Sequence, residues 1–117
     1  MRGWLGVEAG FPPLSVEAEL ACEMAEALGR TGARLKEWWG EALALKELLA
    51  GARERGEEPP PDLLRAYREA QREARRWRYY LIVQREAIGF RHHAEVERRY
   101  PLEALGEPGR GAAARGV

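Results

Sequence analysis

The stretch MAEALGRTGARLKEWWGEALALKELL, residues 24–49, decides the fold, because its apolar residues return at alternating steps of four and three. This spacing places them along one side of an α-helix and forms the seam of a heptad repeat. The seam positions are Met24, Leu28, Thr31, Leu35, Trp38, Ala42, Leu45 and Leu49. We therefore expect a long amphipathic helix over this stretch.

A second seam with the same spacing begins after residue 62. Its positions are Leu63, Tyr67, Ala70, Ala74, Trp77, Leu81, Gln84, Ile88, Arg91 and Glu95. The segment ERGEEPPP, residues 54–61, separates the two seams, and its glycine and three prolines do not continue a helix. The sequence therefore predicts an all-α fold, a long antiparallel helical hairpin over residues 15–101 with its turn at 54–61.

The position of the turn also predicts which seam residues meet. Folding the chain back near residue 58 brings large residues beside small ones and one tryptophan beside another. The predicted pairs are Leu49 with Tyr67, Leu45 with Ala70, Ala42 with Ala74, Trp38 with Trp77, Leu35 with Leu81, and Leu28 with Ile88. We expect the first helix to begin at the N-cap residue Ser15 and the second to end before Pro101.

Two glycines, Gly29 and Gly32, leave an alternative open in the first helix. In a helix interior they cost about 1 to 2 kcal/mol together, so they would suit a break that gives three helices. However, the heptad spacing before Gly29 continues unshifted after Gly32, which a loop would preserve only by chance. A continuous helix is the favoured alternative.

Composition agrees with the all-α class and excludes several kinds of protein. Of the 117 residues, 45% are hydrophobic and 32% charged, and the chain lacks Asn. This composition, rich in helix-forming residues, is also typical of thermophile proteins. The formal net charge is zero, so no overall field selects nucleic acid or an anionic membrane. With a single cysteine, Cys22, no secretory signal and no membrane-length apolar run, we expect a cytoplasmic protein.

The two ends of the chain differ from the hairpin in composition. Residues 1–14, MRGWLGVEAGFPPL, form an apolar N-terminal arm punctuated by glycine and proline, which we expect to dock on an apolar surface. Residues 102–117 end in GEPGRGAAARGV, which offers nothing to bury. We expect these residues to be a disordered tail.

The second helix is apolar around most of its circumference between residues 79 and 90, more than a two-helix hairpin is able to bury. Either the N-terminal arm or a second copy of the chain would cover it. Because two-fold pairing is the commonest closed solution, we expect a homo-oligomer, most simply a dimer that forms a four-helix bundle. The predicted interface residues are Tyr79, Tyr80, Ile82, Val83 and Phe90.

An arginine stripe precedes this segment on the outer face of the second helix. Its members are Arg65, Arg68, Arg72, Arg75 and Arg76. A basic stripe that ends in an aromatic residue suits nucleic-acid binding. The favoured alternative is a solvated helix face whose arginines pair with interleaved glutamates such as Glu69.

Metal and cofactor sites are not indicated. His92 and His93 adjoin each other near several glutamates, but neither histidine falls on the seam, as a metal site inside a helical bundle requires. The chain also lacks a phosphate-binding glycine loop and a nucleophile elbow. We therefore expect no cofactor and no bound metal.

Arg85 and His92 stand seven residues apart, which places them on one face of the expected second helix. This spacing resembles the Arg-x(4–6)-His motif of the HEPN ribonucleases, which are small, all-α and dimeric. The resemblance implies that Arg85 stabilises phosphate charge and that His92 assists proton transfer, in metal-independent cleavage of RNA at a dimer interface. The chain departs from that family at Glu86, whose charge would repel RNA.

Together these features favour a non-enzymatic interaction or scaffold module that self-associates through the segment from Tyr79 to Phe90 and has room for a protein partner. Nucleic-acid binding by the arginine stripe is the second hypothesis, and ribonuclease activity at Arg85 and His92 is the third.

Overall fold

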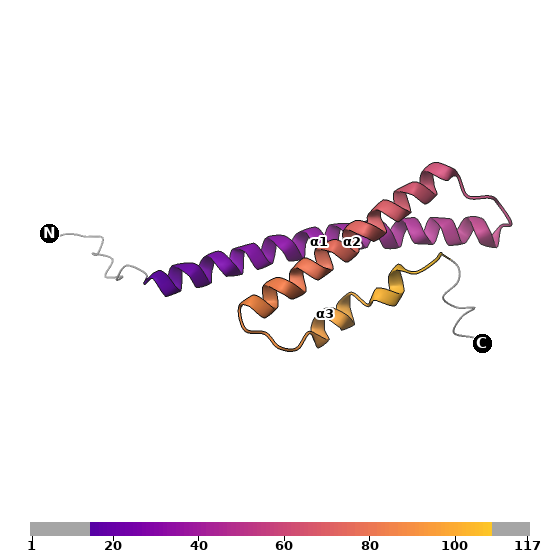
Figure 1. The fold of residues 1–117 in the computed structure, drawn as a ribbon. Helices are drawn as coiled ribbons and strands as arrows, with labels where there is room; N and C mark the ends of the chain where they lie inside the picture. The colour runs from indigo at the N-terminus through magenta and orange to yellow at the C-terminus, as the bar shows by residue number, and fades with distance from the viewer. Residues whose placement is uncertain (1–14, 109–117) are drawn as a thin grey trace, which may run out of the picture.

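The computed structural model describes residues 15–108, and all regular structure within them is helical. Helices α1 (Val16–Glu54) and α2 (Pro61–Ala87) form an antiparallel hairpin. A short helix, α3 (Ala94–Arg99), and a 3-10 turn, η1 (Leu102–Leu105), run back along it (Figure 1). The predicted all-α class is confirmed, whereas the predicted arm at 1–14 lies outside the described residues.

Helix α1 is continuous through Gly29 and Gly32, so the favoured alternative is confirmed. Ser15 caps the helix as predicted, because its hydroxyl oxygen accepts a hydrogen bond of 3.0 Å from the backbone N–H of Ala18. The 39 residues of α1 extend about 58 Å, at about 1.5 Å per residue. The third helix of the fold arises from a break at another place.

That break follows Ala87 and makes the predicted end of the second helix, at Pro101, wrong. Gly89 has a φ of +106°, which an L side chain rarely adopts. The N–H groups of Gly89 and Phe90 donate to the carbonyls of Glu86 and Arg85, the paired bonds of a Schellman motif. The same pair of bonds ends α1 around Gly56, whose φ is +73°.

The core lies along the two predicted seams. Its buried seam residues are Leu35, Ala42, Leu49, Tyr67, Ala70 and Ala74, with Trp38, Leu45, Leu63, Trp77 and Leu81 packed partly buried against them. Trp39 is more deeply buried than the seam residue Trp38, because its ring packs edge-on against Tyr100, with ring centroids 5.2 Å apart. The central parts of both seams therefore lie in the core, and Trp39 joins it because the chain after α2 folds back onto α1.

Residues 102–108 pack on the hairpin, so the predicted disordered tail is wrong for them. The side chain of Leu105 is fully buried in the hairpin core, and Pro108 is also fully buried. The sequence reasoning treated these residues as isolated from the hairpin and missed that they offer two apolar side chains to it. Residues 109–117 lie outside the described residues.

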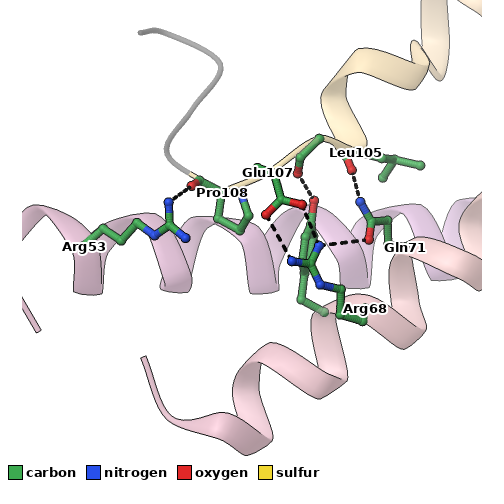
Figure 2. Close-up of polar contacts among 8 residues, drawn as sticks. Arg53, Arg68, Gln71, Leu105, Glu107 and Pro108 are labelled. Atoms are coloured by element: carbon green, nitrogen blue, oxygen red, sulfur yellow. Dashed lines mark hydrogen bonds and ion pairs between the residues drawn. The ribbon is translucent and has the colours of Figure 1, made fainter. Parts of the chain in front are cut away.

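Polar contacts clasp this segment to both long helices (Figure 2). Both terminal nitrogens of Arg68 donate to the Glu107 carboxylate, at 2.9 and 3.0 Å. Backbone carbonyls of the segment also accept hydrogen bonds from side chains of the hairpin. The donor and acceptor residues are Lys46 to Ala104, Arg53 to Pro108, Tyr67 to Gly106, and Gln71 to Leu105. The segment is therefore an integral part of the fold.

The two glycines inside α1 generate a first prediction. An added Cβ at Gly29 or Gly32 would meet nothing within 4 Å, so the double Gly29→Ala, Gly32→Ala variant gains helix propensity without a clash. We expect its free energy of unfolding to rise by about 1 to 2 kcal/mol in urea denaturation. Gly89→Ala is the control and should lower stability, because alanine is strained at that φ. A double variant less stable than the wild type would contradict the open environment of both glycines.

Tyr67 generates a second prediction. Burial, reinforced by the nearby Glu107 carboxylate, raises the pKa of its phenol. The stability that this group contributes is complete below its unfolded pKa of about 10, and it declines as the pH rises from there through the folded pKa. Tyr67→Phe loses the hydrogen bond to Gly106 and should cost about 1 kcal/mol at pH 7. In urea denaturation this difference from the wild type should shrink above pH 10; a difference independent of pH would contradict the prediction.

Candidate functional site

The predicted interface residues remain largely uncovered on the surface of the hairpin. Tyr79 is 64% exposed and Val83 is 42% exposed, and Tyr80 and Phe90 are also classed as exposed. Ile82 is half-buried. We call these five residues the aromatic surface.

The aromatic surface is held in place by contacts along α2 and its C-terminal turn. The ring of Tyr80 lies 5.5 Å from that of Trp77 in an edge-on contact, and 6.2 Å from that of Tyr79. Beyond the end of α2, the Phe90 ring lies against the Arg85 guanidinium, 4.5 Å from the ring centroid. These contacts order the rings without burying them.

The hairpin has two sides, and the described residues that follow α2 cover one of them. On the covered side, α3 closes a cavity of about 370 Å³ between the helices, with Gly29 and Gly32 of α1 on one wall and Val96 and Tyr100 on the other. This arrangement uses the short helix that follows the break in α2. It leaves no part of the described chain to cover the opposite side at the same level.

On that opposite side, a cavity of about 490 Å³ lies between α1 and α2. We call it the open groove, because its lining residues come from α1 and α2 alone. They are Ala27, Arg30, Thr31, Ala33, Arg34, Trp77 and Gln84. The contact between Trp77 and Tyr80 joins the open groove to the aromatic surface.

Two polar groups of the open groove have no partner within the described residues. The indole N–H of Trp77 and the side-chain carbonyl oxygen of Gln84 are both buried and make no hydrogen bond there. A buried donor or acceptor without a partner costs free energy, about 1 to 3 kcal/mol. The guanidinium of Arg34 stands over Trp77, 5.5 Å from the ring centroid. The groove wall therefore contains one buried donor and one buried acceptor that have no partner within the described residues.

The arginine stripe is partly engaged in contacts within the chain. Arg65 pairs with Asp62, and Arg68 is held by Glu107. Arg76 donates from Nε to the Tyr80 hydroxyl at 3.2 Å, and this hydrogen bond is the main reason that its pKa is raised. Arg72 and Arg75 are exposed and make no ion pair with described residues. Two of the five predicted arginines therefore remain available to a phosphate backbone.

The structure does not place Arg85 and His92 on one helix face, so that prediction is wrong. Helix α2 ends at Ala87, and His92 lies in the turn before α3. Arg85 donates from Nη2 to the backbone carbonyl of His92 at 3.0 Å and from Nε to Nδ1 of His93 at 3.2 Å. Nε2 of His93 lies 3.1 Å from the Glu86 carboxylate. Arg85 thus holds the turn together.

Among the described residues, no group of three or more histidine, cysteine, aspartate or glutamate side chains has a geometry that would hold a metal ion. In the same part of the chain, no helix is long and apolar enough to cross a membrane.

Sequence reasoning found the residues of the aromatic surface but missed the open groove as a site. Arg30 and Arg34 were not predicted as site residues, because they lie off the seam. Trp77 was predicted as a core residue only. The signal that was present is the pair Gly89 and Phe90, a glycine followed by an apolar residue as in a Schellman motif. This pattern predicts that α2 ends near residue 88. The chain that follows is then short, and it is able to cover only one side of the hairpin.

Comparison of the chain with protein-family models, with curated proteins and with solved structures gave no match.

Proposed function

We propose that the protein is a helical interaction module that pairs with a second copy through the aromatic surface. The observation that carries the proposal is the simultaneous exposure of Tyr79, Tyr80, Val83 and Phe90 at one end of the hairpin. Clustered apolar side chains on a water-exposed face are typical of protein interaction sites. A non-enzymatic role accords with the contacts of Arg85, which are made within its own turn.

The shape of the protomer also supports association. The chain measures 77 × 28 × 17 Å with a radius of gyration of 21.5 Å, whereas a compact chain of this length has about 13 Å. A body this thin has little interior in which to bury apolar side chains. Pairing two such hairpins would create a thicker core shared by both copies.

A two-fold dimer is the simplest assembly that uses the aromatic surface. In a two-fold interface the same surface of each copy meets its equivalent, so one apolar patch per protomer suffices and the assembly closes. Each protomer contributes α1 and α2, and the pair would form a four-helix bundle with α3 of each copy on its outer side. The uncovered side of the hairpin leaves room for that arrangement.

Nucleic-acid binding is less well supported by the contacts of the arginine stripe. Arg65, Arg68 and Arg76 already bind acceptors within the chain, which leaves Arg72 and Arg75. Each phosphate that a protein neutralises adds to affinity and to its salt dependence, so two free arginines would give weak binding. We therefore propose self-association through the aromatic surface, and not nucleic-acid binding by the arginine stripe, as the function of α2.

A charge in the aromatic surface should break the dimer. Val83→Glu should weaken self-association about 10-fold or more, because the new carboxylate would be buried without a partner in the interface. Val83 is exposed in the protomer, so its helix content and monomer fold should be preserved. Size-exclusion chromatography with light scattering over a range of concentrations measures the change.

Leu43→Glu is a matched control, because Leu43 is a similarly exposed apolar residue, at 39%, outside the aromatic surface. It should leave the oligomeric state unchanged. A wild-type chain that is monomeric at every concentration would refute the proposal, and so would a Val83→Glu variant that associates like the wild type.

A further inference from the structure

The first three turns of α1 project beyond the other described helices. Helix α1 has 39 residues and α2 has 27, so α1 extends past the end of its partner at the N-terminal side (Figure 1). We call residues 16–28 the overhang. Its apolar side chains Val16, Leu20 and Met24 recur every four residues and are between 45% and 68% exposed. The overhang is thus an amphipathic helix whose apolar side chains have no partner among residues 15–108.

The charge of α1 changes sign where the overhang ends. Residues 16–28 contain four glutamates and no basic residue, and Arg30, Arg34 and Lys36 follow within the next three turns. Glu19, Glu23 and Arg30 make no ion pair with described residues. Arg34 forms an ion pair of 3.6 Å with Glu37, but both side chains are exposed, so this pair is weak. Two antiparallel copies of α1 would therefore attract each other.

Their charges also select a register. Glu19, Glu23, Arg30 and Arg34 are separated by four, seven and four residues, which places them on one face of α1. A two-fold axis midway between residues 26 and 27 pairs Glu19 with Arg34 of the second copy and Glu23 with its Arg30. Symmetry repeats both pairs, so four ion pairs form at one crossing.

The same register places the overhang of one copy along the open groove of the other. Ala27, Arg30 and Arg34 line that groove. Ala27 and Glu26 flank the axis, and on the side of Ala27 the small side chain allows the two helices to approach closely. Leu20 of the second copy falls at the same level along α1 as Ala33, a small residue of the lining. The groove is mostly apolar between these charges, so an apolar side chain suits it.

We infer that the overhang of a second copy lies antiparallel in the open groove, with its Glu19 and Glu23 bound to Arg34 and Arg30. This inference rests on the proposed self-association and adds a second contact in the same dimer, outside the aromatic surface, with its own direction and register. Apolar contact would supply most of the affinity, whereas the ion pairs would select the antiparallel register over others. By symmetry, the overhang of each copy would lie in the groove of the other, so the dimer would contain this contact twice.

Charge exchange tests the register. One variant carries Glu19→Arg and Glu23→Arg, and the other carries Arg30→Glu and Arg34→Glu. Each variant alone should self-associate about 10-fold or more weakly than the wild type, because four attractive pairs become repulsive. An equimolar mixture should restore the wild-type affinity, because every facing pair is then of opposite charge.

Native mass spectrometry and sedimentation equilibrium distinguish the mixed dimer from the two self-pairs by mass and by affinity. Glu41→Arg with Glu47→Arg is the control, since both glutamates are exposed on α1 away from the overhang and the groove. Recovery in the mixture excludes misfolding as the cause of the loss. Failure of the mixture to recover would overturn the register.

A cysteine crosslink tests the position of the axis. In a Cys22→Ser background, Ala27→Cys should form a disulfide-linked dimer rapidly under mild oxidation, because the two copies of residue 27 face each other beside the axis. Ala44→Cys, an exposed position on the same helix, should not. A wild-type chain that dimerises while neither the mixture nor residue 27 responds would overturn this inference and leave the proposed function standing. A chain that stays monomeric would overturn both.

Discussion

Gly89 turns the chain out of α2 with a φ of +106°, and much of the architecture follows from that turn. Because the helix stops at Ala87, the next residues are free to reverse and place α3 along one side of the hairpin. That reversal brings Tyr100 against Trp39 and Leu105 into the core. It also shortens α2 relative to α1, which leaves the overhang. One backbone conformation therefore both completes the core and exposes the surface that we propose for association.

The covered and uncovered sides of the hairpin differ in how well their polar groups are satisfied. On the covered side, hydrogen bonds such as Lys46 to Ala104 and Arg78 to Tyr100, at 2.8 and 2.7 Å, tie side chains to backbone carbonyls. On the uncovered side, Trp77 and Gln84 keep a donor and an acceptor without partners among the described residues. A folded chain seldom leaves buried polar atoms in that state. Within the described residues, the two sides therefore differ in how completely α3 and the segment after it supply hydrogen-bond partners.

Periodicity predicted the seams because it depends on residues that are near each other in sequence. The seam residues from Leu35 to Leu49 and from Tyr67 to Ala74 are in the core as that spacing requires. The end of α2 was mispredicted because the seam was followed through Arg91 and Glu95, although neither is apolar, while the local signal at Gly89 was not used. Trp39 could not be distinguished from Trp38, since its partner Tyr100 comes from a segment that the hairpin alone does not place. The open groove was likewise invisible, because it depends on which side α3 occupies.

The clasp between the hairpin and residues 104–108 has a consequence for how the chain folds during synthesis. Contacts between α1 and α2 join residues that all precede the end of α2 at Ala87, so the hairpin is able to form before α3 and η1 have been synthesised. Tyr67, Arg68 and Gln71, however, find their acceptors some 34 to 39 residues further along the chain. Until those residues leave the ribosome, the buried phenol and the site of Leu105 remain open to water. The hairpin therefore completes its core only after residues 104–108 have been synthesised.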